Sequence, residues 1–304
     1  MTLDDIRRPG PGMLALMGVA ACAVIWGTTW YAITWQLGVV DPIASVTWRF
    51  GLAAIVLFVV LVVLRRPIAL TRRQHFEAMG QGAFVFAVSY AFTYAAEGHV
   101  TSAIVAVVFA SMAFTNLVMF RLIERQRAVR AAWLAAGLGL LGVVVLSGGE
   151  LFSARLGPEA LLGIGFAVLA MSSSTLGNWF SWRNQEAGAA VMPATAWAMA
   201  YGSVMLVIYG LATGVEFTID PSPRYLISLA YLSVVGSVAA FVIYFSVARS
   251  KGFAFASYIS ALTPLIATLM SVLFEDARFG WTALVGLALV LSGQVLLSRT
   301  PKAG

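Results

Sequence analysis

Aromatic and amide side chains recur at helical spacing inside apolar segments of this chain. Trp26 and Trp30 lie four residues apart, as do Tyr90 and Tyr94, so each pair occupies one face of a helix. Aromatic faces stack on flat solutes, and amide and hydroxyl groups bond their polar ends. The residues that we expect to line a cavity for such a solute are Trp26, Trp30, Tyr90, Tyr94, Met112, Asn116, Asn178, Trp179, Tyr244, Ser257, Tyr258 and Thr263.

Three ionisable residues lie in or beside the same apolar segments. Arg49 is well inside one of them, where it either recognises a carboxylate, reaches towards the surface or pairs with a neighbouring group. Glu97 and His99 close another segment and form the one pair suited to proton transfer. Because we find no Asp or Glu near the middle of any apolar segment, we favour movement down a gradient over obligatory proton exchange.

The sequence offers little for catalysis or metal binding. Cys22 is the single cysteine, and the two histidines, His75 and His99, are far apart in sequence and lack zinc-site spacing. Neither a GxxxxGK[ST] phosphate loop nor a GxSxG nucleophile turn occurs. We therefore predict that the protein is not an enzyme and holds no metal or cofactor.

The composition is that of a membrane protein. The chain is 61% hydrophobic and 11% charged, with a mean hydropathy of +0.90, whereas soluble domains are about 25% charged. The apolar runs are continuous, which favours helices over barrel strands. We predict ten transmembrane helices at 13–35, 43–64, 77–97, 101–123, 129–147, 158–180, 190–213, 224–248, 253–274 and 278–297.

The basic residues predict the orientation of these helices. With ten spans, 15 of the 19 Lys and Arg fall on the side of the two termini, and three (Arg155, Arg224 and Arg278) fall on the other. Excess Lys and Arg mark the cytoplasmic face, so both termini are expected to be cytoplasmic in an inner membrane. The net charge of +6 then reflects topology, and we predict no nucleic-acid partner.

The chain also repeats itself at an offset of 151 residues. Glu124 and Arg127 match Glu275 and Arg278, and the apolar run that follows each pair matches in turn. Five spans per repeat is an odd number, so the second copy enters the membrane inverted. We predict an all-α fold of two inverted five-helix repeats, 13–147 and 158–298, between cytoplasmic tails at 1–12 and 299–304.

Several short motifs resemble the drug/metabolite transporter superfamily, EamA type, over about residues 13–298. They are Trp26-Gly27-Thr28, Pro42 with Arg49, Ala103 through Met119 to Glu124-Arg125, Thr263-Pro264-Leu265 and Leu273-Phe274-Glu275. One departure is Ala113, which stands where the second repeat has Pro264 and where the family often has proline. The aromatic content is most similar to that of exporters of aromatic amino acids and amphipathic compounds.

The resemblance implies a secondary transporter with alternating access. We predict gradient-driven export of small amphipathic metabolites, of which aromatic and other neutral amino acids fit best, through a central uncharged cavity. The alternatives are export of cationic drugs or other metabolites by proton antiport, and, less favoured, a channel. Gly98, Gly252 and Pro264 are the hinge candidates, the two glycines because they lie in the shortest links. The expected partners are a small solute and the lipid bilayer, and both monomer and homodimer fit the sequence.

Overall fold

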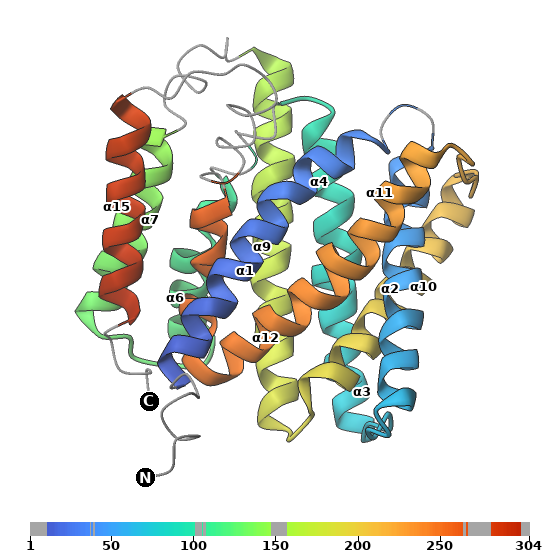
Figure 1. The fold of residues 1–304 in the computed structure, drawn as a ribbon, viewed down its shortest axis with the longest axis horizontal. Helices are drawn as coiled ribbons and strands as arrows, with labels where there is room; N and C mark the ends of the chain where they lie inside the picture. The colour runs from blue at the N-terminus through green and yellow to red at the C-terminus, as the bar shows by residue number, and fades with distance from the viewer. Residues whose placement is uncertain are drawn as a thin grey trace, which may run out of the picture.

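The computed structural model describes residues 11–36, 38, 40–100, 105, 108–146, 157–263, 266 and 281–298. Throughout these residues the elements are helices joined by turns and short loops, which confirms the predicted all-α class (Figure 1). The elements are α1 (Pro11–Thr34), α2 (Pro42–Val63), α3 (Arg72–Gln81), η1 (Gly82–Val88), α4 (Ser89–Glu97), α6 (Met112–Ile123), α7 (Arg130–Leu146), α9 (Pro158–Glu186), α10 (Val191–Thr213), α11 (Pro223–Ser233), η2 (Val234–Ala239), α12 (Ala240–Lys251), α13 (Phe253–Ser257) and α15 (Trp281–Ser298).

Five helices of the described part are long and apolar enough to cross a membrane. They are Gly12–Ile33, Pro42–Val63, Pro158–Glu186, Val191–Thr213 and Pro223–Lys251. Shorter apolar helices cover Met112–Ile123, Arg130–Gly142, Phe253–Thr263 and Leu284–Gly293, and α3, η1 and α4 run on without a break. The predicted spans 101–123 and 253–274 extend into residues outside the description, together with Glu275 and Arg278, so the count of ten stays a prediction.

Local sequence signals explain where several helices begin and end. Asp41 accepts a hydrogen bond from the Ile43 amide at 2.7 Å, and Pro42 occupies the first turn of α2. Ser222 caps α11 in the same way ahead of Pro223. Gly214 ends α10 with a φ of 79°, a left-handed conformation that glycine adopts without strain. Both ends of α2 and α10, and the start of α11, lie within one residue of the predicted boundaries.

Two π-helical segments interrupt the third and eighth predicted spans at matching positions. η1 and η2 end at Val88 and Ala239, which are 151 residues apart, the offset of the sequence repeat. The indole Nε1 of Trp26 on α1 donates to the Gly236 carbonyl of η2 at 3.2 Å, and Ser173 Oγ on α9 donates to the Phe84 carbonyl of η1 at 2.7 Å. The first helix of each predicted repeat therefore bonds a π segment of the other, and π segments often occur at functional sites.

The hydrogen bond from Ser173 to η1 leads to a stability prediction. Replacing Ser173 with alanine removes the bond to Phe84 and is expected to lower the free energy of unfolding by about 1 kcal/mol, as measured by thermal unfolding in detergent. Ser246→Ala is the matched control, because the Ser246 hydroxyl only bonds the Val242 carbonyl of its own helix and is exposed. Equal stabilities of the two variants would show that the bond from Ser173 to Phe84 does not stabilise the fold.

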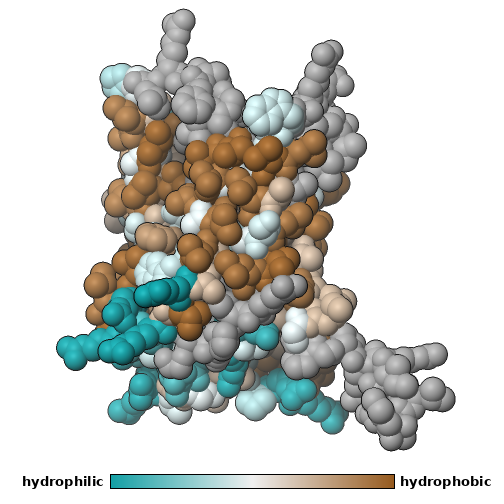
Figure 2. Space-filling model, turned by 90° about the vertical axis from the view of Figure 1, so that its left-hand side faces the viewer, coloured by the Kyte–Doolittle hydropathy of each residue, from teal (hydrophilic) through white to brown (hydrophobic). Residues whose placement is uncertain are grey.

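The basic residues are concentrated at one end of the molecule. α1 begins and α15 ends at the lower end of Figure 1, and Figure 2 shows hydrophilic side chains gathered there below a broad apolar band. Among the described residues, the cations at the helix ends on this side are Arg65, Arg66, Arg72, Arg73, Arg121, Arg125, Arg127, Arg130, Arg183, Arg249 and Lys251. We call this the basic end; Arg224, at the start of α11, lies at the opposite end.

α7 and α15 pack against each other at one edge of the bundle (Figure 1). A Cβ atom at Gly142 would lie 2.8 Å from the Gly286 carbonyl oxygen and from the Val290 nitrogen, so glycine permits this close contact.

The backbone distinguishes the hinge candidates. Gly252 separates α12 from α13 with φ 91° and ψ 160°, a conformation that favours glycine. Gly98 is in the right-handed helical region, with φ −71° and ψ −15°, so its backbone makes no special demand for glycine. Pro264 lies outside the described residues.

Candidate functional site

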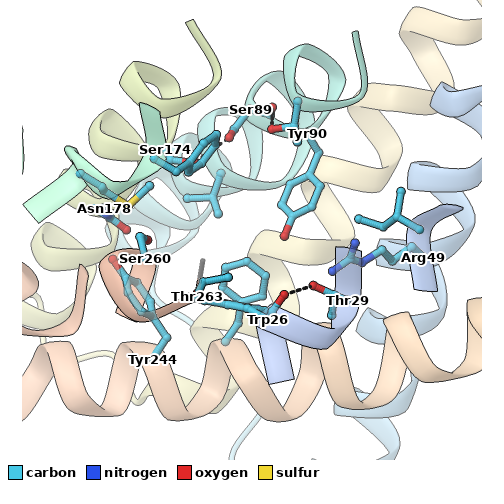
Figure 3. A pocket seen from close by; sticks show the side chains of 16 residues that line it. Trp26, Thr29, Arg49, Ser89, Tyr90, Ser174, Asn178, Tyr244, Ser260 and Thr263 are labelled. Carbon is cyan, nitrogen blue, oxygen red and sulfur yellow. Dashed lines mark hydrogen bonds between the residues drawn. The ribbon is translucent and has the colours of Figure 1, made fainter. Parts of the chain in front are cut away.

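A cavity lies between the helices of the two predicted repeats, with about 840 Å³ of empty space including its open mouth. Figure 3 shows polar side chains at its two ends, with Arg49 and Tyr90 at one and Asn178, Ser260 and Tyr244 at the other. The residues that line it are Trp26, Thr29, Ile33, Arg49, Val85, Ser89, Tyr90, Thr93, Phe109, Met112, Ser174, Asn178, Phe241, Tyr244, Ser260 and Thr263.

Six of the twelve predicted cavity residues belong to this lining: Trp26, Tyr90, Met112, Asn178, Tyr244 and Thr263. The aromatic rings form a continuous wall. The Trp26 ring centroid is 5.1 Å from Phe241 and 5.4 Å from Tyr244, and Phe50 joins Phe86 at 5.0 Å to Tyr90 at 4.7 Å. The wall offers apolar contact and ring faces to a solute.

Arg49 places a buried cation in the cavity wall. Its exposed fraction is 1%, so the side chain does not reach towards the surface. Arg49 Nε donates to Ser237 Oγ at 2.9 Å, and the guanidinium carbon lies 4.9 Å from the Tyr90 ring centroid and 5.3 Å from that of Phe50. Among the described residues, Nη1 has no hydrogen-bond partner. Arg49 therefore keeps one unpaired N–H group at the cavity wall, and ring stacking fixes the orientation of its guanidinium.

The prediction of an uncharged cavity is therefore wrong at one position. Arg49, for which recognition of a carboxylate is one of the predicted alternatives, is among the residues that line the cavity. The physical reason is that the hydrogen bond to Ser237 and the contacts with two aromatic rings stabilise the guanidinium inside the bundle and offset part of the cost of burying its charge.

Tyr94 and Glu97 lie beside Arg49 but outside the cavity lining. Tyr94 is 4% exposed and interacts electrostatically with Arg49 and Glu97. Glu97 and His99, the predicted proton-transfer pair, make no direct ion pair with each other among the described residues; His99 Nδ1 lies 2.8 Å from Glu159 Oε2 at the exposed start of α9. Glu97 instead interacts electrostatically with Arg49.

A layer of amides and hydroxyls lies next to the cavity on the side of the basic end. Asn116 Nδ2 donates to Ser257 Oγ at 2.6 Å, and the Tyr244 hydroxyl lies 2.9 Å from the same oxygen. Asn178 Nδ2 donates to Asn116 Oδ1 at 3.5 Å. Asn116 and Ser257, both 0% exposed, thus join α6, α9, α12 and α13 instead of lining the cavity.

Trp179 belongs to a further layer nearer the basic end, contrary to its predicted place in the cavity. Its Nε1 donates to Glu124 Oε1 at 2.6 Å, and the guanidinium carbon of Arg183 lies 4.8 Å from its ring centroid. Arg183 also pairs with Glu77 at 2.8 Å. Asn178 faces the cavity, and the next residue of an α-helix is turned by about 100°, which directs Trp179 elsewhere. Glu124, which accepts this indole bond, lies at the end of α6.

Tyr258 also faces away from the cavity. Its hydroxyl donates to the Val290 carbonyl of α15 at 2.8 Å, and a Cβ at Gly139 on α7 would meet its ring at 2.9 Å. Tyr258 therefore joins the segment after α13 to the α7–α15 pair. The side chain of Trp30 is outside the description, so its predicted role stays untested.

Most lining residues that sequence reasoning missed are helical neighbours of predicted ones. Thr29, Thr93 and Ser174 lie three or four residues from Trp26, Tyr90 and Asn178. The same spacing relates Phe109, Phe241 and Ser260 to Met112, Tyr244 and Thr263, and Ser89 bonds Ser174 at 2.6 Å. Helical periodicity extended from each predicted residue could have found them. Ile33 carries the same signal, because it lies three residues after Trp30, whereas Val85 does not.

Eight of the lining residues fall into pairs separated by 151 residues. The pairs are Tyr90 with Phe241, Thr93 with Tyr244, Phe109 with Ser260, and Met112 with Thr263. The repeat offset found in the later helices thus also relates the cavity walls of the third and eighth, and fourth and ninth, predicted spans. Equivalent positions of two repeats meet around one shared space, as expected near a pseudo-two-fold axis.

Comparison with known proteins gives consistent results. The profile of the EamA-like transporter family matches residues 13–148 and 161–299. Protein PecM of Dickeya dadantii (strain 3937) is 24% identical over 280 residues, covering 90% of this chain and 88% of that protein. The uncharacterized inner membrane transporter YedA of Escherichia coli (strain K12) is 27% identical over 298 residues, covering 95% and 94%. A protein of known crystal structure has the same fold, with a TM-score of 0.77, 16% identity, and coverage of 93% and 95%.

Proposed function

Because the chain belongs to the EamA-like transporter family and is a multi-pass membrane transporter, we propose that it exports small amphipathic metabolites that carry a carboxylate, with aromatic and other neutral amino acids as the best-matched class. The observation that carries this proposal is Arg49, whose buried guanidinium belongs to the wall of an aromatic-lined cavity and keeps one N–H group unpaired. An arginine in this setting binds a carboxylate strongly, and the rings accept an apolar side chain.

The charge of the cavity argues against the alternative of cationic drugs. Among its lining residues, the fixed charge is that of Arg49, and none is Asp or Glu. A solute that carries a positive charge and no carboxylate would be repelled by Arg49 in a medium of low dielectric constant, which disfavours its binding. The lack of a lining carboxylate among the described residues also favours gradient-driven movement over proton antiport.

The repeat symmetry supports alternating access. Four pairs of equivalent residues line one cavity, and each predicted repeat bonds a π segment of the other. Two halves that can exchange conformations expose such a shared site first to one side and then to the other. On the proposed topology the basic end is cytoplasmic. The layer formed by Trp179, Glu124 and Arg183 then separates the cavity from the cytoplasm.

The test is uptake of radiolabelled L-phenylalanine, L-threonine and a cationic dye into sealed proteoliposomes containing the full chain. We expect saturable phenylalanine uptake that other neutral amino acids inhibit, with little uptake of the dye. Protein-free liposomes give the background. Uptake that does not saturate and is accompanied by conductance would indicate a channel, and dye uptake without phenylalanine uptake would reject the proposed class. Uphill movement driven by a pH gradient would overturn the gradient-driven mechanism.

A further inference from the structure

Three polar groups near one end of the cavity have no hydrogen-bond partner among the described residues. They are Arg49 Nη1, the Tyr94 hydroxyl and Glu97 Oε1, and each of these atoms is buried. A buried polar atom without a partner costs free energy, so a solute that bonds these three groups gains from satisfying them. We call these three residues the Arg49–Glu97 subsite.

Helix α4 carries two members of this subsite, Tyr94 and Glu97, which lie next to the cavity lining. Tyr90 and Thr93 line the cavity, and Glu97 is one helical turn beyond Thr93 on the same face. Arg49 reaches this face from α2 and stacks on Tyr90. Tyr94, on the same helix as Glu97, interacts electrostatically with both Arg49 and Glu97.

The two opposite charges are separated by a gap. Arg49 and Glu97 interact electrostatically but make no direct ion pair among those of the described chain. Arg49 Nη1 needs an acceptor, Glu97 Oε1 needs a donor, and a phenol hydroxyl serves as either. A simple anion would satisfy only Arg49, and a simple cation only Glu97. A solute that carries both charges a short distance apart satisfies all three groups.

We propose that Arg49 and Glu97 together bind the zwitterionic head of the solute, with its carboxylate at Arg49 and its ammonium group at Glu97. This inference rests on the proposed function and adds Glu97 as the residue that determines specificity for a zwitterion over a plain carboxylate. The apolar body of the solute then lies along Trp26 and Phe241. Tyr94 positions the two charged groups by bonding across the gap.

The experiment compares three probes with the same ring and chain length in proteoliposomes of the full chain. L-Phenylalanine has both charges, 3-phenylpropionate lacks the ammonium group, and phenethylamine lacks the carboxylate. Competition against labelled L-phenylalanine and direct uptake are measured for the natural chain, Glu97→Gln and Glu97→Asp. Glu97→Gln keeps the size of the side chain and removes its charge, and Glu159→Gln, at the exposed partner of His99, is the matched control.

The natural chain is expected to prefer L-phenylalanine to both single-charge probes. Glu97→Gln is expected to weaken L-phenylalanine about 10-fold to 100-fold and to leave 3-phenylpropionate unchanged or improved, with Glu97→Asp in between. Equal losses for L-phenylalanine and 3-phenylpropionate, or no loss for either, would overturn the subsite while leaving the proposed function intact. A Glu97→Gln variant that loses only its response to a pH gradient would also overturn it, because Glu97 would then carry a proton. No uptake of any probe by the natural chain would reject the proposed function itself.

Discussion

Replacing Arg49 with glutamine is expected to lower L-phenylalanine transport about 100-fold. The change removes a buried charge that faces the cavity, and a charge-assisted hydrogen bond to a carboxylate in such a place contributes about 2–3 kcal/mol. Glutamine retains an amide N–H that can still bond Ser237, so the packing against Phe50 and Tyr90 changes less than with alanine. The loss therefore falls mainly on solutes that carry a carboxylate.

Arg49→Lys separates charge from geometry in the same assay. Lysine keeps the positive charge but loses the planar guanidinium that stacks on two rings and bonds Ser237, so we expect an intermediate loss. Arg224→Gln is the matched control, because Arg224 also lies over an indole ring, that of Trp35 at 5.2 Å, but lies outside the cavity. If Arg49→Gln and Arg224→Gln transport equally well, Arg49 does not bind the solute. Initial rates at several concentrations and thermal unfolding of each variant complete the measurement.

Helix bounds could be predicted from this sequence because capping residues and apolar runs are local signals. α10, predicted at 190–213, covers Val191–Thr213, whereas α9, predicted to end at residue 180, continues to Glu186. The extension carries Arg183, whose pairing with buried Glu77 holds a polar turn inside the bundle. That contact joins residues more than a hundred positions apart, and a hydropathy profile contains no sign of it.

The sequence predicts which helices carry the site residues and how deep in the membrane they lie, but not which face of each helix points into the cavity. Asn178 and Trp179 both carry the signal of a polar or aromatic group within an apolar helix, yet one lines the cavity and the other bonds Glu124. Which of two neighbours faces inward depends on packing against the other repeat. The π segments are a second case, because the extra residue that shifts the phase of the eighth span has no residue-type signature in the sequence.

Gly82→Ala adds one methyl group and is expected to destabilise the protein strongly. Gly82 begins η1 and faces α10, where a Cβ would overlap the Ala198 carbonyl oxygen and lie 3.0 Å from the Gly202 nitrogen. Gly202 in turn would place a Cβ 2.8 Å from the Gly82 carbonyl oxygen. Both obstacles are backbone atoms of helices, so no side-chain rotation relieves the overlap. We expect a loss of about 3 kcal/mol, measured by thermal unfolding in detergent.

Gly165→Ala provides the control for this prediction, because a Cβ there would have no neighbour within 4 Å. Alanine favours a helix over glycine by about 1 kcal/mol, so Gly165→Ala is expected to be neutral or slightly stabilising. The two variants thus carry the same chemical change with opposite expected signs. The effect of Gly82→Ala should also reach transport, because Phe86, one turn along η1, packs against Phe50 and Phe241 in the cavity wall. Equal stability of the two variants would mean that η1 and α10 separate easily and would contradict the close backbone contact argued for Gly82.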